Sequence, residues 1–134
     1  MHLDHVGVAV EDLEAAVSFY SRTLGAVVTE RYDLPHDKVR VAFLDAGGAL
    51  LELLQPVGDE GPVFRFLQRR GEGLHHLAFL VPDLVQSLAD ARASGQRLID
   101  ERPRPGAGGR LIAFLHPVTS HGVLVELIQA PQVG

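Results

Sequence analysis

An internal repeat is the feature that most constrains what this chain can fold into. The matching segments, in chain order, are LDHVGVAVEDL with LHHLAFLVPDL (3–13 and 74–84), AFL with AFL (42–44 and 113–115), and ELLQ with ELIQ (52–55 and 126–129). The first two pairs are offset by 71 positions and the third by 74. Three matches in the same order indicate two similar halves, about residues 1–57 and 72–130, with the extra residues in a turn of the second half.

Each half has the same expected order of elements. A β-rich run leads to Asp12 or Asp83, which suit the N-cap of a helix, and apolar residues then recur at helical spacing as far as Gly25 or Gly95. Three strand-like runs follow in each half, and a short linker helix is expected at about 61–71. The sequence therefore predicts an α+β fold of two tandem βαβββ modules in a single domain, 1–134. The eight expected strands are 3–10, 26–33, 38–45, 49–55, 74–81, 97–102, 110–116 and 122–129.

Composition narrows the class of protein. The 134 residues suit one globular domain, and 46% hydrophobic with 22% charged residues argues against disorder. The absence of cysteine removes disulfides and thiolate sites, and the net charge of −5 argues against a nucleic-acid partner. Neither a signal peptide nor a membrane span is apparent, so we expect a cytoplasmic protein with no membrane partner.

Four polar residues occupy strand positions that are normally apolar. In the first strand the period of two places His5 on one face with the small residues Gly7 and Ala9, which leaves open space over the sheet. His76 has the equivalent position in the second half. Glu52 and Glu126 each lie among aliphatic residues, where an isolated carboxylate would carry a large desolvation cost.

These four residues predict a metal site. A single buried histidine is usually a hydrogen-bonded core residue, and a single strand glutamate usually lies on a solvated edge. Here two histidines and two glutamates have equivalent positions in two repeats, and symmetric packing of the halves would direct all of them to one point. Two imidazoles and two carboxylates suit a divalent transition metal such as Zn, Ni, Co, Mn or Fe, with positions left for a substrate.

The remaining polar features have simpler interpretations. We expect His75 to point to the face opposite His76, and His116 is at most a residue beside the site. The glycine run 106–109 is interpreted as a hairpin turn. A cluster of arginines in the linker helix is either its solvated face or a surface that attracts a phosphate-bearing substrate. This cluster comprises Arg65, Arg69 and Arg70, and the histidines interpreted as exposed or terminal are His2, His36 and His121.

The motifs LDHVGVAVEDL, RGEGLHHLAF, GAGG followed by FLHP, and GVLVEL resemble the methylmalonyl-CoA epimerase family of the vicinal oxygen chelate, or glyoxalase-like, superfamily. The resemblance extends from Leu3 to Gln129. It implies paired βαβββ modules that form a cupped, eight-stranded mixed sheet around a metal ion. The ligands it implies are His5, Glu52, His76 and Glu126.

The resemblance also implies a reaction. The family interconverts (R)- and (S)-methylmalonyl-CoA by proton abstraction at C2 through a metal-stabilised enediolate, so the resemblance implies that this chain is an isomerase. Glu126 is expected to be one catalytic base. Some relatives have a glutamate where this chain has Val41, so the second base is open, with Glu52 or a bound water as the candidates.

The resemblance further implies a divalent metal cofactor, with Co²⁺ or Mn²⁺ favoured and Zn²⁺ or Ni²⁺ as alternatives. An acyl-CoA thioester is the expected substrate, and a homodimer the expected assembly. Two rival functions remain open at this point. One is a glyoxalase I-like lyase acting on a glutathione hemithioacetal, which uses the same types of ligand. The other is a non-catalytic small-molecule-binding member of the superfamily.

Overall fold

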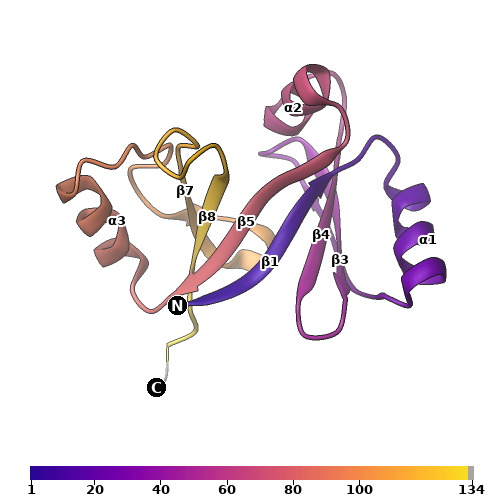
Figure 1. Cartoon of the computed structure of the whole chain (residues 1–134), viewed down its shortest axis with the longest axis horizontal. Coiled ribbons are helices and arrows are strands. Elements are labelled where there is room, and N and C mark those ends of the chain that lie inside the picture. Colours follow the sequence, from indigo (N-terminus) through magenta and orange to yellow (C-terminus); the bar gives the residue numbers. More distant parts are fainter. Residues whose placement is uncertain (133–134) are drawn as a thin grey trace. The chain divides into compact units, whose positions relative to one another are not determined.

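The computed structural model describes residues 1–132 and contains three α-helices and eight strands among them (Figure 1). The strands are β1 (His2–Ala9), β2 (Val27–Leu34), β3 (Val39–Asp45), β4 (Leu50–Pro56), β5 (Gly73–Val81), β6 (Arg104–Pro105), β7 (Leu111–Leu115) and β8 (Leu124–Gln129). The helices are α1 (Leu13–Leu24), α2 (Pro62–Arg70) and α3 (Leu84–Ala93). The strands pair in the order β2-β3-β4-β1 in the first half and β5-β8-β7-β6 in the second, with parallel and antiparallel pairs in each half, which confirms the predicted mixed α+β fold. No helix in residues 1–132 has the length and apolar character needed to cross a membrane.

The first compact unit, His5–His75, has one helix-covered sheet face. Asp12 caps α1 by accepting a hydrogen bond from the Ala15 backbone N–H at 3.1 Å, and Gly25 ends the helix in the left-handed conformation at φ 75°. The buried side of α1 packs on alternate residues of β1, β3 and β4 (Figure 1). This core comprises Val8, Val10, Leu13, Val17, Ala26, Ala42, Leu44 and Leu53.

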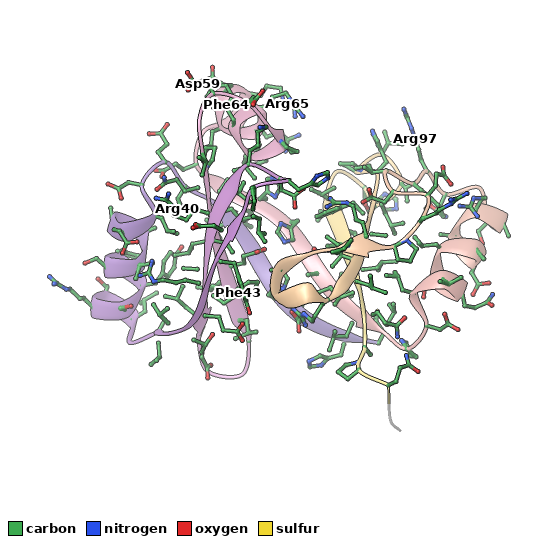
Figure 2. The ribbon with its side chains drawn as sticks, turned by 180° about the vertical axis from the view of Figure 1, so that it is seen from behind. Arg40, Phe43, Asp59, Phe64, Arg65 and Arg97 are labelled. Atoms are coloured by element: carbon green, nitrogen blue, oxygen red, sulfur yellow. The ribbon has the colours of Figure 1, made fainter. Side chains whose placement is uncertain are left out.

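The other face of these strands carries the intervening residues. Arg40 and Phe43 of β3 are three positions apart, so their side chains lie on opposite faces of the sheet (Figure 2). Phe43 lies in register with Glu52 of β4, and Glu52 with Gly7 of β1, so the three residues share one face. The prediction that His5, Gly7 and Ala9 lie on a face with small side chains agrees with this register.

The second unit comprises Met1–Asp4 and the chain from His76 onward, and it repeats the arrangement. Asp83 caps α3 through the Gln86 N–H at 3.1 Å, and Leu84 and Leu88 are the buried residues of the helix. They pack with Val81, Ala113 and Leu127 on one sheet face. Residues on the opposite face form a separate cluster of Ala78, Ile112 and Ile128, with Leu80 and Phe114 packed against it.

The predicted strand at 97–102 is wrong. Strand β6 has only two residues, Arg104 and Pro105, and the segment before it makes one isolated bridge, Leu98 to Leu115. The Asp100 carboxylate accepts a hydrogen bond from the Phe114 N–H at 2.9 Å, and the Ile99 and Asp100 N–H groups both donate to the Phe114 carbonyl oxygen. A side chain therefore replaces the backbone partner that a continuous ladder would supply.

Gly106, in the loop before β7, lies close to the side chain of Ile112. A Cβ atom on Gly106 would lie 3.0 Å from Ile112 side-chain atoms. The loop contains a 3-10 turn at Ala107–Gly109, so the interpretation of the glycine run as a turn is confirmed.

A glutamine joins each helix to the strand that carries the buried glutamate. Gln55 accepts a hydrogen bond from the Leu13 N–H at 2.7 Å, and Gln129 accepts one from the Leu84 N–H at 2.8 Å. Each glutamine is three residues after its glutamate, so the two side chains leave opposite faces of the strand. In each of the matching segments ELLQ and ELIQ, the glutamate therefore lies on one face of the strand and the glutamine on the other.

We expect Gln129→Ala to lower the free energy of unfolding by about 2 kcal/mol and Gln55→Ala by about 1 kcal/mol. Gln129 has the larger effect because its amide also donates to the carbonyl oxygens of Pro82 and Ala130. Urea denaturation followed by circular dichroism measures both changes. The exposed Gln68→Ala is the control and should change stability by less than about 0.5 kcal/mol. Equal effects at all three positions would contradict the assignment of a capping role.

Candidate metal centre

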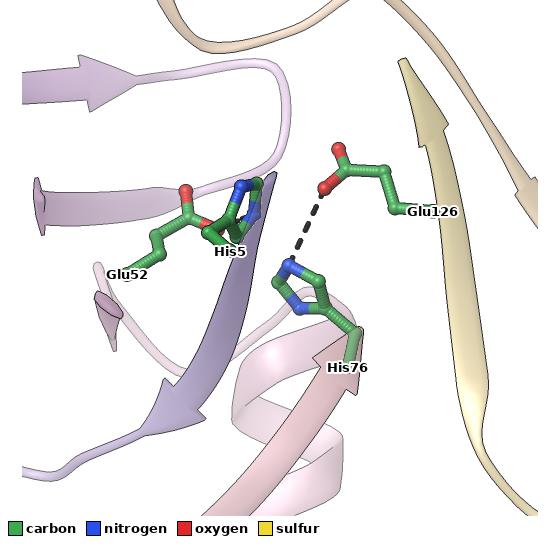
Figure 3. Close-up of side chains that lie close together, drawn as sticks. All are labelled: His5, Glu52, His76 and Glu126. Atoms are coloured by element: carbon green, nitrogen blue, oxygen red, sulfur yellow. Dashed lines mark ion pairs between the residues drawn. The ribbon is translucent and has the colours of Figure 1, made fainter. Parts of the chain in front are cut away.

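The first unit holds one buried histidine–glutamate pair. Residues of β1 and β4 run in parallel register, and His5 Nε2 lies 3.2 Å from Glu52 Oε1 (Figure 3). His5 is 2% exposed and Glu52 5% exposed. Gly7 is the residue in register with Glu52, and its lack of a side chain leaves the carboxylate room above the sheet.

The second unit holds the equivalent pair. His76 Nε2 of β5 lies 3.3 Å from Glu126 Oε1 of β8, as the dashed line in Figure 3 marks. Both residues are buried, with exposed fractions of 4% and 7%. Ala78 is in register with Glu126, so a small residue again lies beside the carboxylate. Each half thus positions one imidazole nitrogen against one carboxylate oxygen in the same way.

A phenylalanine opposite each glutamate supports the neighbouring imidazole. Phe43 is in register with Glu52, and its ring makes an edge contact with His5 at a centroid distance of 5.2 Å. Phe114 is in register with Glu126, and its ring lies edge-on to His76 at 6.0 Å. The repeated AFL tripeptide is the sequence signal for this pair, although the sequence interpretation assigned it no role.

The two halves differ next to these phenylalanines. In the first unit the Tyr32 ring contacts Phe43 edge-on at 6.1 Å. In the second unit the Arg104 guanidinium lies 5.6 Å from the Phe114 ring centroid, and its Nε donates to Asp100 at 3.1 Å. An aromatic side chain in one half therefore corresponds to a positively charged one in the other.

The other histidines lie outside the group of four buried donors. His75 makes an edge contact with Phe66 of α2 at 4.9 Å, consistent with the opposite parity to His76. His116, expected at most beside the site, accepts a hydrogen bond from the Val118 N–H at 3.1 Å and stabilises its own turn. His36 and His121 are exposed.

A charged pair next to His5 in the chain was not predicted from the sequence. Arg110 donates two hydrogen bonds to Asp4, at 3.1 and 2.9 Å, in a partly buried bidentate pair. Because 106 positions separate the two residues, no local pattern could have indicated this contact.

The donor set is chemically suited to a metal ion. His5, Glu52, His76 and Glu126 are all buried, and each offers one ligand atom. Nitrogen and carboxylate oxygen donors in equal number are typical ligands of divalent transition metals, and a carboxylate buried among aliphatic residues needs a compensating positive charge. The chain therefore contains a buried group compatible with a divalent metal ion.

Comparison with known proteins defines the class. Residues 4–114 match the family model described as the Glyoxalase/Bleomycin resistance protein/Dioxygenase superfamily. Together with the repeated βαβββ order and the two buried histidine–glutamate pairs, this match shows that the chain belongs to that superfamily. Within it, the relatives below show that the chain belongs to the methylmalonyl-CoA epimerase family, as the motifs predicted.

Two curated relatives and one solved structure show the similarity. The mitochondrial methylmalonyl-CoA epimerase of Homo sapiens is 41% identical over 129 residues, which cover 96% of this chain and 73% of the human protein. The ethylmalonyl-CoA/methylmalonyl-CoA epimerase of Cereibacter sphaeroides is 39% identical, with 95% and 96% covered. A variant Streptomyces coelicolor methylmalonyl-CoA epimerase in complex with 2-nitronate-propionyl-CoA superposes with a TM-score of 0.92 at 38% identity, covering 98% of this chain and 99% of that one.

Proposed function

We propose that this protein is an epimerase that interconverts (R)- and (S)-methylmalonyl-CoA. The observation that carries the proposal is the pair of equivalent, buried histidine–glutamate contacts, in a chain about 40% identical to epimerases over nearly its full length. A carbon acid such as C2 of a malonyl thioester needs a base held away from water and a positive charge near its oxygens. Buried carboxylates with a metal-binding donor set supply both requirements.

We propose that His5, Glu52, His76 and Glu126 together hold one divalent metal ion. Equivalent positions in the two repeats and the burial of all four side chains support this assignment. Mixed imidazole and carboxylate donors suit several divalent ions, and the resemblance to the epimerase family favours Co²⁺ or Mn²⁺, with Zn²⁺ or Ni²⁺ as alternatives. When bound, the ion would draw charge from the thioester and carboxylate oxygens of the substrate and so make the C2 proton more acidic.

We propose that Glu126 and Glu52 are the two catalytic bases. Glu126 removes the C2 proton of one epimer, and the electron pair of the C–H bond moves into the thioester carbonyl to give a planar carbanion equivalent. Glu52 carries a proton at the start on the carboxyl oxygen that is not the ligand atom, and returns this proton to C2 from the opposite face. The two carboxylates end the turnover with their protonation states exchanged, ready for the reverse reaction.

Val41 supports Glu52 as the second base. The position is fully buried and in register with Leu54, so it presents an aliphatic group to the same face of the sheet as Glu52. No carboxylate is available there in this chain. In residues 39–45 of β3 the only acidic residue is Asp45, at the exposed end of the strand.

Proton NMR in D₂O tests the function. We expect the metal-loaded protein to catalyse loss of the C2 proton signal of methylmalonyl-CoA and to be inactive on the glutathione hemithioacetal of methylglyoxal. Turnover of the hemithioacetal without exchange at C2 would favour the glyoxalase I-like lyase. Saturable binding of methylmalonyl-CoA with neither reaction, in protein that retains about one metal ion per chain, would favour the non-catalytic binder.

We also propose that residues 1–134 act as one domain, that the protein is a homodimer and that it works in the cytoplasm. The homodimer is supported by apolar residues in the second half of α1 and at the start of β2 that are more than half exposed, namely Phe19, Leu24 and Val27. Light scattering after gel filtration gives the mass in solution, and a mass of one chain would overturn the dimer.

A further inference from the structure

Positive charge is unevenly distributed over this acidic protein. Six of the twelve lysine and arginine side chains form ion pairs with aspartate or glutamate within the part of the chain that the structure describes. Half of the other six lie on one short helix, α2, as Arg65, Arg69 and Arg70. All three are exposed.

The arrangement on α2 is unfavourable by itself. Arg65 and Arg69 are four residues apart, so two like charges share one side of the helix, which destabilises it. Among residues 1–132, no carboxylate lies within ion-pair distance of either side chain. Lys38 differs, because its ammonium donates to Glu60 at 2.8 Å, and this hydrogen bond and charge lower the pKa of the Glu60 carboxyl.

The helix is nevertheless firmly attached to its unit. Val63 is buried, and Phe66 makes the edge contact with His75. The Arg70 guanidinium lies 5.9 Å from the Phe66 ring centroid, which holds this charge at the surface. Arg65 lies on the outer part of α2, as Figure 2 shows, so a fixed scaffold presents three guanidinium groups to solvent.

The position of α2 relative to Glu52 suits an elongated anionic ligand. Glu52 is four residues before Pro56, the last residue of β4, which corresponds to about 13 Å along the strand. The chain then turns into α2 within the same compact unit. Acyl-CoA carries its reactive acyl group at one end of an extended pantetheine arm and its three phosphate groups at the other.

We propose that Arg65 and Arg69, assisted by Arg70, bind the phosphate groups of the acyl-CoA substrate. The inference rests on the proposed function and names the part of the substrate that α2 recognises. A guanidinium donates two parallel N–H bonds to phosphate oxygens, and a phosphate between two arginines removes their mutual repulsion. The protein has a net charge of −5 and as a whole repels a polyanionic substrate. A local cationic surface offsets this repulsion where the substrate binds.

The double variant R65Q/R69Q tests this. We expect KM for methylmalonyl-CoA to rise about tenfold, equal to about 1.4 kcal/mol, with kcat changed less than about twofold. The KM for methylmalonyl-pantetheine, which lacks all phosphates, should not change. R22Q/R102Q removes the same charge from exposed arginines elsewhere and is the matched control, and melting curves of both variants verify folding.

Calorimetric titration of the protein with free CoA tests this inference independently of the proposed function. If wild-type protein does not exchange the C2 proton but binds CoA, and R65Q/R69Q weakens that binding about tenfold, only the epimerase proposal fails. If R65Q/R69Q and R22Q/R102Q give the same KM and the same affinity for CoA, the role of α2 is overturned. Absence of CoA binding by the wild-type protein also overturns it.

Discussion

Replacing Glu126 by glutamine should slow epimerisation in both directions by about 10²- to 10⁴-fold. The amide retains a carbonyl oxygen of nearly the same shape but cannot accept the C2 proton. Solvent exchange should stop for the epimer whose proton faces Glu126 and continue for the other epimer. Glu52→Gln should give the reverse pattern, and proton NMR in D₂O with each pure epimer measures both.

Two controls make this result specific. Metal content is determined for each variant, because loss of exchange together with loss of metal would indicate a ligand role alone. Glu101→Gln removes an exposed carboxylate that pairs with Arg92 on α3 and should leave the rate within about twofold of wild type. Exchange of both epimers at the wild-type rate in Glu126→Gln would exclude this residue as a base.

Removing the metal should reduce exchange at C2 to the uncatalysed background. A strong chelator followed by dialysis gives the apoprotein, and addition of Co²⁺ or Mn²⁺ should restore the activity. Metal that binds only the folded state should also raise stability, by about 2.7 kcal/mol at a concentration one hundred times Kd. The melting temperature with and without each ion is a readout independent of catalysis.

His76→Ala should remove the increase in melting temperature that the metal ion causes. Loss of an imidazole donor should weaken metal affinity by at least about 100-fold, since removal of groups that only orient ligands already costs 10- to 100-fold. The control is His36→Ala, an exposed histidine in the turn between β2 and β3. Full activity of the chelated, dialysed wild-type protein would contradict a metal-dependent reaction.

Local sequence patterns predicted much of the fold because the spacing of apolar residues differs between helices and strands and is a strong signal for each. Asp12 and Gly25 mark both ends of α1 by capping chemistry, and the alternation in β1 places His5 with small residues. The prediction failed at 97–102, where the Asp100 side chain takes the place of a backbone partner. Such a contact depends on a residue fourteen positions away, which no local pattern contains.

The amino-acid sequence by itself determined the repeat, the helices, seven of the eight strands and the four candidate donor residues, because these depend on neighbours along the chain. Only the tertiary structure decided which glutamate meets which histidine. His5 contacts Glu52 and His76 contacts Glu126 because, in each half, a helix and two further strands bring the chain back to a strand that pairs in parallel with the one carrying the histidine. The same is true of the Asp4–Arg110 pair, since contacts between distant residues form only when strand register and packing have brought the backbones together.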